Sequence, residues 1–182
     1  MGVCSSRRNA VPPPTPPKKY CNDKKSDNDI EETTFNESCD VKQLWNQTKP
    51  FVPPVNKGRV IKVYDGDTIT IASKIPGLRN SPLYRFSVRL NGIDTPELKG
   101  GKNEQEKEVA ILARDWLSSQ ILNKDIELRE VQTEKYGRLL AEVWFNKKNM
   151  NQEMIKKRFA VTYDGGTKNS PDNWVTYHNN RV

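Results

Sequence analysis

Carboxylate, hydroxyl and guanidinium side chains that could handle a phosphate and a hard cation lie in three short stretches of this sequence. The candidates are Asp65, Asp67, Thr68, Arg89, Asp94, Thr95, Glu97 and Arg138. Hard cations such as Ca²⁺ are held by carboxylates and backbone carbonyls, and Asp67 and Asp94 supply two carboxylates. Two arginines, Arg89 and Arg138, could fork onto a phosphate and stabilise charge that builds at phosphorus. The set favours phosphoester chemistry.

Glu97 follows Asp94 across a proline, Pro96. Because a proline biases the preceding residue towards an extended backbone, this segment should stay out of a helix. Glu97 can then approach a cation held by Asp94 without being forced to ligate it. Taken singly, each candidate could be only a turn, a cap or a solvated strand charge. Their occurrence together and in this order favours a site.

The strands that must position these residues follow from alternating side chains. Val60–Tyr64 and Thr68–Ile71 flank Asp65-Gly66, and an Asp-Gly dipeptide between β-rich runs predicts a hairpin. Phe86, Val88 and Leu90 alternate with polar residues, which predicts a third strand. Two further strands are expected at 126–128 and 139–145.

An amphipathic helix is predicted after the third strand, over about residues 104–120. Its apolar residues follow the spacing i, i+3, i+4, i+7, i+8 and are Val109, Leu112, Ala113, Trp116 and Leu117. A short helix is expected near residues 150–157. The fold class is therefore α+β and mainly β, compatible with a small closed barrel that carries two or three packed helices.

The composition fits one domain with an appendage. The chain has 182 residues, 34% of them hydrophobic, and a mean hydropathy of −0.85. The first 55 residues hold 8 of the 12 prolines. We expect residues 1–55 to form a disordered arm, 56–168 the domain, and 169–182 a polar tail in which His178 is solvated. No apolar run is long enough for a membrane span or a secretory signal.

The charge of the domain indicates which partners it can bind, and the cysteine spacing indicates which stabilising groups are absent. Residues 56–182 carry 22 of the 30 Lys and Arg residues and 16 of the 23 Asp and Glu residues, so the domain is basic and suits a polyanion. Cys4, Cys21 and Cys39 lack the spacing of a zinc site or a disulfide framework.

Within the arm, residues 41–45 place Val41, Leu44 and Trp45 on one helical face. A short helix is possible there, but we expect disorder.

The extreme N-terminus, MGVCSS, fits the pattern for myristoylation of Gly2, with Cys4 placed for palmitoylation. Basic residues further along the arm could contact anionic lipid, and stable anchoring takes two such signals. This predicts a peripheral protein on the cytoplasmic face of a membrane, in a eukaryotic cell or in a cell infected by a eukaryotic virus. The alternative is a disordered start with an accidental glycine and cysteine.

Three motifs resemble one family. VYDGDT (Val63–Thr68), VRLNGIDTPE (Val88–Glu97) and EKYGRLLAEVW (Glu134–Trp144) are similar to the staphylococcal nuclease, or thermonuclease, family of calcium-dependent phosphodiesterases. The likeness covers about residues 57–167 and implies a five-stranded OB-fold barrel. The acylated start is similar to plant membrane-anchored members. The connection from Ser73 to Tyr84 is longer than in the secreted bacterial enzymes.

The resemblance also implies roles for individual residues. The implied calcium ligands are Asp67, Asp94 and the Thr95 carbonyl. Asp65 would support these ligands without binding the ion itself. The implied residues at the substrate are Glu97 on the attacking water, Arg89 and Arg138 on the phosphate, and Tyr136 and Lys135 beside the nucleotide. The expected reaction cuts DNA or RNA, leaves 3′-phosphate ends and uses Ca²⁺. The protein is expected to be a monomer.

Two rival functions remain open. One is a barrel kept for binding nucleic acid or protein without catalysis, in which case one or more charged positions should be lost. In this sequence Asp67, Arg89, Asp94, Glu97 and Arg138 are all present. The other is a lipid-anchored adaptor whose arm matters most.

Overall fold

The computed structural model describes residues 41–100, 104–134, 136–167 and 169–180. The chain divides into two units, Met1–Trp45 and Asn46–Val182. The predicted acylation sites Gly2 and Cys4, the disorder expected for residues 1–40, and the candidate Lys135 lie outside the described residues.

A short helix, α1 (Val41–Gln47), occupies the segment for which we expected disorder, so that expectation was wrong and the helical alternative is the one observed. Leu44 is half-buried, whereas Val41 and Trp45 are each 80% exposed. Helical spacing of three apolar residues was therefore the informative signal in this segment.

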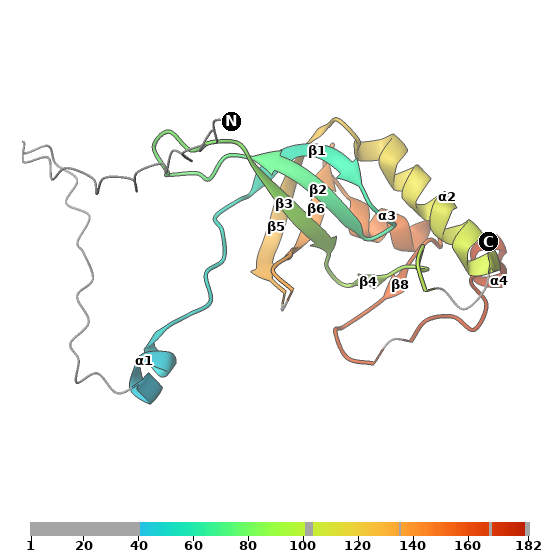
Figure 1. The fold of residues 1–182 in the computed structure, drawn as a ribbon. Helices are drawn as coiled ribbons and strands as arrows, with labels where there is room; N and C mark the ends of the chain where they lie inside the picture. Colours follow the sequence, from blue (N-terminus) through green and yellow to red (C-terminus); the bar gives the residue numbers. More distant parts are fainter. Residues whose placement is uncertain (1–40, 101–103, 135, 168, 181–182) are drawn as a thin grey trace, which may run out of the picture. The chain divides into compact units, whose positions relative to one another are not determined.

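Five strands form a closed barrel (Figure 1). They are β1 (Lys57–Val63), β2 (Thr68–Ser73), β3 (Tyr84–Leu90), β5 (Asp125–Thr133) and β6 (Leu139–Phe145). Antiparallel pairing runs β3-β2-β1-β5-β6, and a parallel pairing of β3 with β6 closes the circle. The OB-like, mainly β fold class is confirmed. Because the barrel is closed, each of these five strands pairs with a neighbouring strand on both sides.

The barrel interior explains the alternation in the sequence. Val60 of β1, Ile69 and Ile71 of β2, and Val88 and Leu90 of β3 are fully buried. Because successive side chains of a strand point to opposite faces, the intervening residues Thr70 and Arg89 point the other way. One face of each strand thus builds the core, and the other is available for polar groups.

Three helices pack around the barrel, and their bounds are α2 (Glu104–Ile121), α3 (Met150–Lys156) and α4 (Trp174–Asn179). The predicted inward face of α2 is largely correct, since Val109, Ala113 and Leu117 are buried, although Leu112 is 51% exposed. Among the described residues, no helix combines the length and apolar character that a bilayer crossing requires.

The expectation of a solvated His178 was wrong. His178 is 7% exposed, and its ring stacks on Phe159 with 4.6 Å between the centroids. It lies on α4, where Trp174 is also buried and Tyr177 donates a hydrogen bond from its hydroxyl to the Ala160 carbonyl at 3.1 Å. The segment is polar in composition, yet aromatic residues give α4 one face that packs against α2.

Three short strands complete the fold: β4 (Ile93–Asp94), β7 (Lys148–Asn149) and β8 (Val161–Thr162). β4 pairs with β8, and Asp94 lies opposite Val161. The strand that carries Asp94 is therefore fixed by the C-terminal part of the domain.

Candidate active site

Asp67 ends the turn between β1 and β2, the predicted hairpin. The Tyr64 N–H donates to the Thr68 carbonyl at 2.8 Å, which closes the turn. A Cβ on Gly66 would lie 3.1 Å from the Thr95 side chain and 3.2 Å from Ala113. Glycine thus lets the hairpin approach the segment after β4, so that motifs far apart in the sequence meet.

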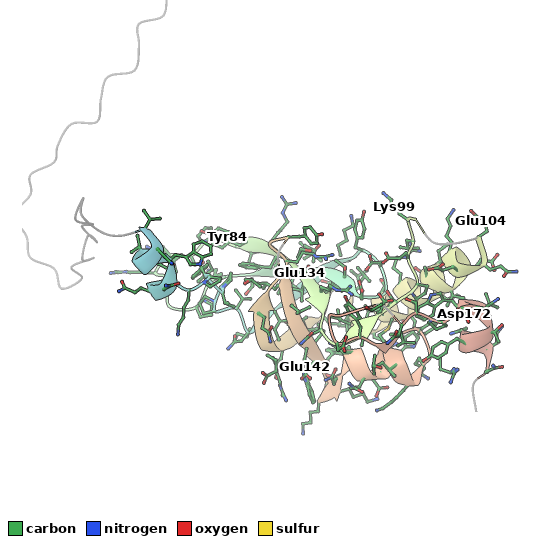
Figure 2. All side chains as sticks on the ribbon, turned by 90° about the horizontal axis from the view of Figure 1, so that it is seen from below. Tyr84, Lys99, Glu104, Glu134, Glu142 and Asp172 are labelled. Carbon is green, nitrogen blue, oxygen red and sulfur yellow. The ribbon has the colours of Figure 1, made fainter. Side chains whose placement is uncertain are left out.

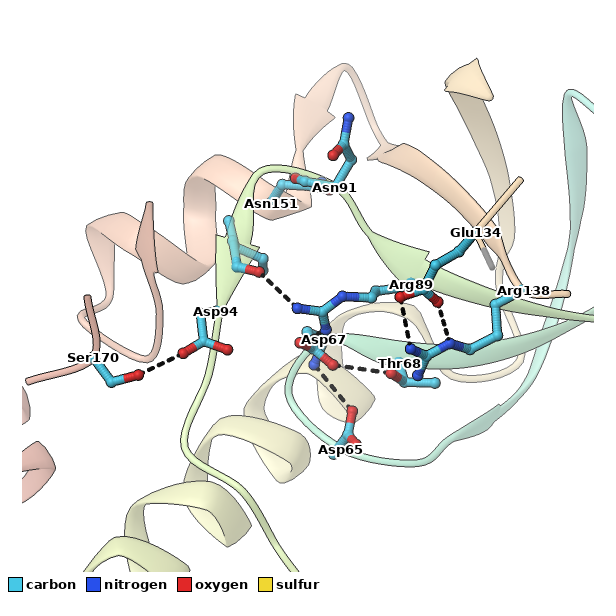
Figure 3. A network of polar contacts seen from close by, with 11 residues as sticks. Asp65, Asp67, Thr68, Arg89, Asn91, Asp94, Glu134, Arg138, Asn151 and Ser170 are labelled. Carbon is cyan, nitrogen blue, oxygen red and sulfur yellow. Dashed lines mark hydrogen bonds and ion pairs between the residues drawn. The ribbon is translucent and has the colours of Figure 1, made fainter. Parts of the chain in front are cut away.

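The carboxylate of Asp67 is buried, at 6% exposure, and both of its oxygens have partners (Figure 3). Oδ1 accepts a hydrogen bond of 2.9 Å from the Thr68 hydroxyl, and Oδ2 forms an ion pair with Nη1 of Arg89. Nη2 of Arg89 also donates to the Ile93 carbonyl at 3.3 Å. Arg89 therefore links the hairpin to the strand that carries Asp94.

Asp94 and Thr95 are 2% and 4% exposed. Oδ2 of Asp94 accepts a hydrogen bond of 2.7 Å from the Ser170 hydroxyl. Sequence reasoning missed Ser170, and no local pattern could have revealed it, because the two residues are 76 positions apart. The C-terminal segment thus orients one candidate metal ligand.

A buried amide fixes the turn that precedes Asp94. Asn151, 2% exposed and on α3, donates from Nδ2 to the Asn91 carbonyl at 2.7 Å and to the Ala141 carbonyl at 3.3 Å. Its Oδ1 accepts from the Val143 N–H at 3.0 Å. One side chain therefore ties α3, β6 and the β3–β4 turn together. Sequence reasoning did not single out this residue.

Asp65 is half-buried beside this cluster, and its Oδ1 accepts from the Asp67 N–H at 3.2 Å. Burial raises the pKa of the Asp65 carboxyl above its ordinary value, while hydrogen bonds from Thr68 and the charges of Arg89 and Arg138 act in the opposite direction. The structure thus brings Asp65 into contact with Asp67, the candidate ligand that it is expected to support.

Arg138 lies at the start of β6 and makes a two-pronged ion pair with Glu134, with distances of 2.6 Å from Nε and 3.0 Å from Nη2. These hydrogen bonds raise the pKa of the Arg138 guanidinium. Tyr136 is 71% exposed, with the guanidinium carbon of Arg138 6.0 Å from its ring centroid. Sequence reasoning missed Glu134 as a partner, although its opposite charge four residues away was a usable signal.

Glu97 is exposed at the edge of the cluster, in the non-helical segment predicted from Pro96. Its backbone N–H donates to Oε1 of Glu106 at 3.4 Å, and Glu106 is a buried residue in the first turn of α2. The segment is thereby held to the helix, and Glu97 itself is exposed.

Two hollows flank the cluster. One, of about 600 Å³, is lined by Arg89, Glu134 and Tyr163 among others. The second, of about 720 Å³, is lined by Asp65 and Glu97 together with residues of β1 and α2. The candidate phosphate contact Arg89 and the candidate base Glu97 thus face different hollows.

The donor chemistry fits a hard divalent cation. Asp67, Asp94 and the Thr95 carbonyl offer only oxygen, the donor type that Ca²⁺ prefers. In the part of the chain that the structure describes, no group of three His, Cys, Asp or Glu side chains could hold a metal ion. A cation here would therefore rely on two carboxylates and on carbonyl, water or substrate oxygens. It would share Asp67 with the guanidinium of Arg89.

A family profile described as staphylococcal nuclease homologue matches residues 87–178, which is half of the chain. The chain belongs to the staphylococcal nuclease family. The matched range contains Arg89, Asp94, Glu97 and Arg138 and extends into α4, ending at His178. It begins after the hairpin that carries Asp67.

Relatives of this staphylococcal nuclease family member are named as endonucleases. An uncharacterized endonuclease of Haemophilus influenzae is 33% identical over 108 residues, covering 59% of this chain and 53% of its own length. A probable endonuclease of Schizosaccharomyces pombe is 33% identical over 129 residues, covering 59% and 56%. A probable endonuclease of Candida glabrata is 36% identical over 95 residues, covering 49% and 35%. The chain thus spans about half or less of the length of these relatives.

Proposed function

We propose that this protein is a calcium-dependent nuclease that hydrolyses phosphodiester bonds of DNA or RNA and leaves 3′-phosphate ends. The observation that carries the proposal is the cluster of Asp67, Arg89 and Asp94, which come from separate elements, with Glu97 exposed beside it. Membership of the staphylococcal nuclease family and the endonuclease names of its relatives support the same reaction class.

Asp67, Asp94 and the Thr95 carbonyl would hold the calcium ion. When bound, the ion neutralises charge on a phosphoryl oxygen and orients the phosphate. The Glu97 carboxylate would orient a water molecule and accept one of its protons as the water oxygen forms a bond to phosphorus. The bond from phosphorus to the 5′ oxygen breaks, and that oxygen takes a proton from solvent.

Arg89 and Arg138 would donate hydrogen bonds to the equatorial phosphate oxygens, where charge grows in the transition state. Each guanidinium is already oriented by a carboxylate, Arg89 by Asp67 and Arg138 by Glu134. Such orientation lowers the reorganisation needed when substrate binds, because the donors have fewer conformations to lose.

The identity of the products tests the proposed reaction directly. Full-length protein is incubated with single-stranded DNA, double-stranded DNA and RNA in the presence of Ca²⁺, Mg²⁺ or excess chelator. Fragments made with Ca²⁺ should become substrates for polymerase extension only after phosphatase treatment, because a 3′-phosphate blocks extension. Products that extend without phosphatase, or full cleavage in chelator, would contradict the proposal.

The alternative is a barrel that binds nucleic acid or protein without cutting. It would be expected to lack at least one of the charged positions, yet Asp67, Arg89, Asp94, Glu97 and Arg138 are all present. Tight oligonucleotide binding without cleavage under every metal condition above would favour this alternative over the nuclease.

We also propose that acyl groups on Gly2 and Cys4 attach the protein to the cytoplasmic face of a membrane. The support is the MGVCSS start together with nearby basic residues such as Arg7 and Arg8. A single acyl chain binds a bilayer only marginally, so the second chain or the basic residues would make the attachment stable. We expect the protein to act as a monomer on this surface.

A further inference from the structure

One of the two hollows at the candidate active site is a groove lined by four basic and three acidic residues. It has a volume of about 720 Å³ and lies between the end of β1 and the helix α2. Asp65 and Glu97 belong to its wall. The wall also contains four basic side chains, a tyrosine and an isoleucine, which are Lys62, Lys99, Lys107, Arg114, Tyr64 and Ile111.

The charges of this groove suit a polyanion. Lys62, Lys99, Lys107 and Arg114 contribute four positive charges, whereas Asp115 is the negative residue of the lining apart from the two active-site carboxylates. Lys107 and Arg114 form ion pairs with neighbouring residues of α2 but remain partly exposed to solvent. The Lys107 ammonium is 3.5 Å from Glu104 and half exposed, and Arg114 pairs with Asp115 at 2.7 Å. Figure 2 shows Lys99 reaching outward from the loop before α2.

The groove also offers surfaces on which bases can stack. Tyr64 is 47% exposed, and the ammonium of Lys62 lies 5.1 Å from its ring centroid. Ile111 of α2, 36% exposed, adds an apolar patch. An aromatic ring among cations is the usual platform for single-stranded nucleic acid, because every base has a π face and every linkage a negative charge.

We infer that this groove binds the single strand that continues beyond the scissile phosphate, so that the protein prefers polynucleotides to mononucleotide esters. The inference rests on the proposed function. It is supported by the shared cluster, because Arg89 lines one hollow while Asp65 and Glu97 line the groove, so that both hollows border residues of the proposed reaction site. A strand bound with its reacting phosphate at this cluster has the groove beside it for the nucleotides that continue the chain.

Binding is measured first, without any requirement for cleavage. The probe is a fluorescein-labelled 20-nucleotide oligo(dT), titrated in excess chelator and followed by anisotropy. Lys107→Gln with Arg114→Gln should weaken binding about 10-fold and reduce the slope of log K against log salt by about 1.4, since about 0.7 counterion is released per contact on a single strand. The matched control, Lys124→Gln with Lys148→Gln, removes two exposed charges outside the groove and should leave both quantities unchanged.

Stacking is tested separately by Tyr64→Leu, which keeps apolar cover but removes the ring. Its affinity for oligo(dT) should fall about 5- to 150-fold, which corresponds to the loss of about 1–3 kcal/mol when one stacked base loses its aromatic partner. Tyr84→Leu is the matched control, because Tyr84 is a partly exposed tyrosine outside the groove that packs edge-on against Phe86.

Cleavage then separates this inference from the proposed function. The ratio of kcat/KM for the oligonucleotide to kcat/KM for a nitrophenyl ester of thymidine 5′-phosphate should fall about 10-fold in the Lys107 and Arg114 double variant and stay constant in the lysine control. If neither substrate is cut, the proposed function fails, and the binding data still decide about the groove.

Three results would overturn the groove assignment. The groove variants and their controls could bind oligo(dT) equally. They could also lose activity on both substrates to the same extent. Finally, the Lys107 and Arg114 double variant could keep its affinity for oligo(dT) but lose binding to vesicles that contain phosphatidylserine, in which case the groove contacts anionic lipid instead of nucleic acid.

Discussion

Replacing Asn151 with alanine should destabilise the domain through one identifiable set of hydrogen bonds. The Asn91 carbonyl loses its 2.7 Å bond and the Val143 N–H its 3.0 Å bond. The Ala141 carbonyl keeps a partner, because it retains the hydrogen bond from the Asn91 N–H at 2.8 Å. A buried polar group that loses its partner costs roughly 1–3 kcal/mol, so two such groups predict a loss of about 2–4 kcal/mol once partial hydration is allowed for. That loss is a large part of the total stability of about 5–15 kcal/mol that is typical of a domain.

Urea unfolding followed by tryptophan fluorescence measures this loss. Asn151→Ala should shift the midpoint without changing the slope, because the same surface is exposed on unfolding. Gln152→Ala is the control, since that neighbouring side chain on α3 is exposed and should change stability by less than about 0.5 kcal/mol. A loss below about 1 kcal/mol for Asn151→Ala would show that the buried amide does not hold the turn as described.

Three further outcomes are expected. Arg138→Ala should lower kcat/KM about 10²- to 10³-fold, through loss of a phosphate contact worth about 2–4 kcal/mol, and a loss shared equally by Glu134→Gln would instead indicate a structural role. Asp65→Asn should stabilise the protein more at pH 7 than at pH 4 in urea titrations. The pKa of Asp65 is raised in the folded state, so the stability that its neutral form contributes is present at low pH and is lost as the carboxyl ionises. An equal effect at both pH values would refute this. Gly2→Ala should release the protein from membrane fractions and Cys4→Ser should release it partly, whereas unchanged partition of Gly2→Ala would remove the anchor from this account.

The strands of the barrel were predictable because their signals are local, whereas closure of the barrel was expected from the resemblance to the family. Alternation over β2 and β3 and the Asp-Gly turn between β1 and β2 each depend on a few adjacent residues. The same holds for α2, whose apolar spacing gave its bounds to within one residue, at Ile121 in place of residue 120. Local periodicity and turn chemistry were sufficient for these elements.

The contacts that orient the candidate ligands were not predictable in this way. Ser170 reaches Asp94, and Asn151 reaches Asn91, only after the chain has folded around the barrel. His178 was misjudged because a polar composition masked the aromatic face of α4. Long-range partners of polar groups depend on tertiary placement, which neither periodicity nor spacing encodes.

The most direct test of the nuclease proposal compares wild type with Glu97→Gln on a single-stranded 20-nucleotide DNA, with Ca²⁺ and with excess chelator. We expect the wild-type protein to cleave the DNA with Ca²⁺ and to lose this activity in excess chelator. In Glu97→Gln, kcat should fall by about 10²- to 10⁴-fold while KM changes little, because the carboxylate acts on the water and not on the phosphate. Equal kcat values for the two proteins, or cleavage by wild type that persists in chelator, would contradict the proposal.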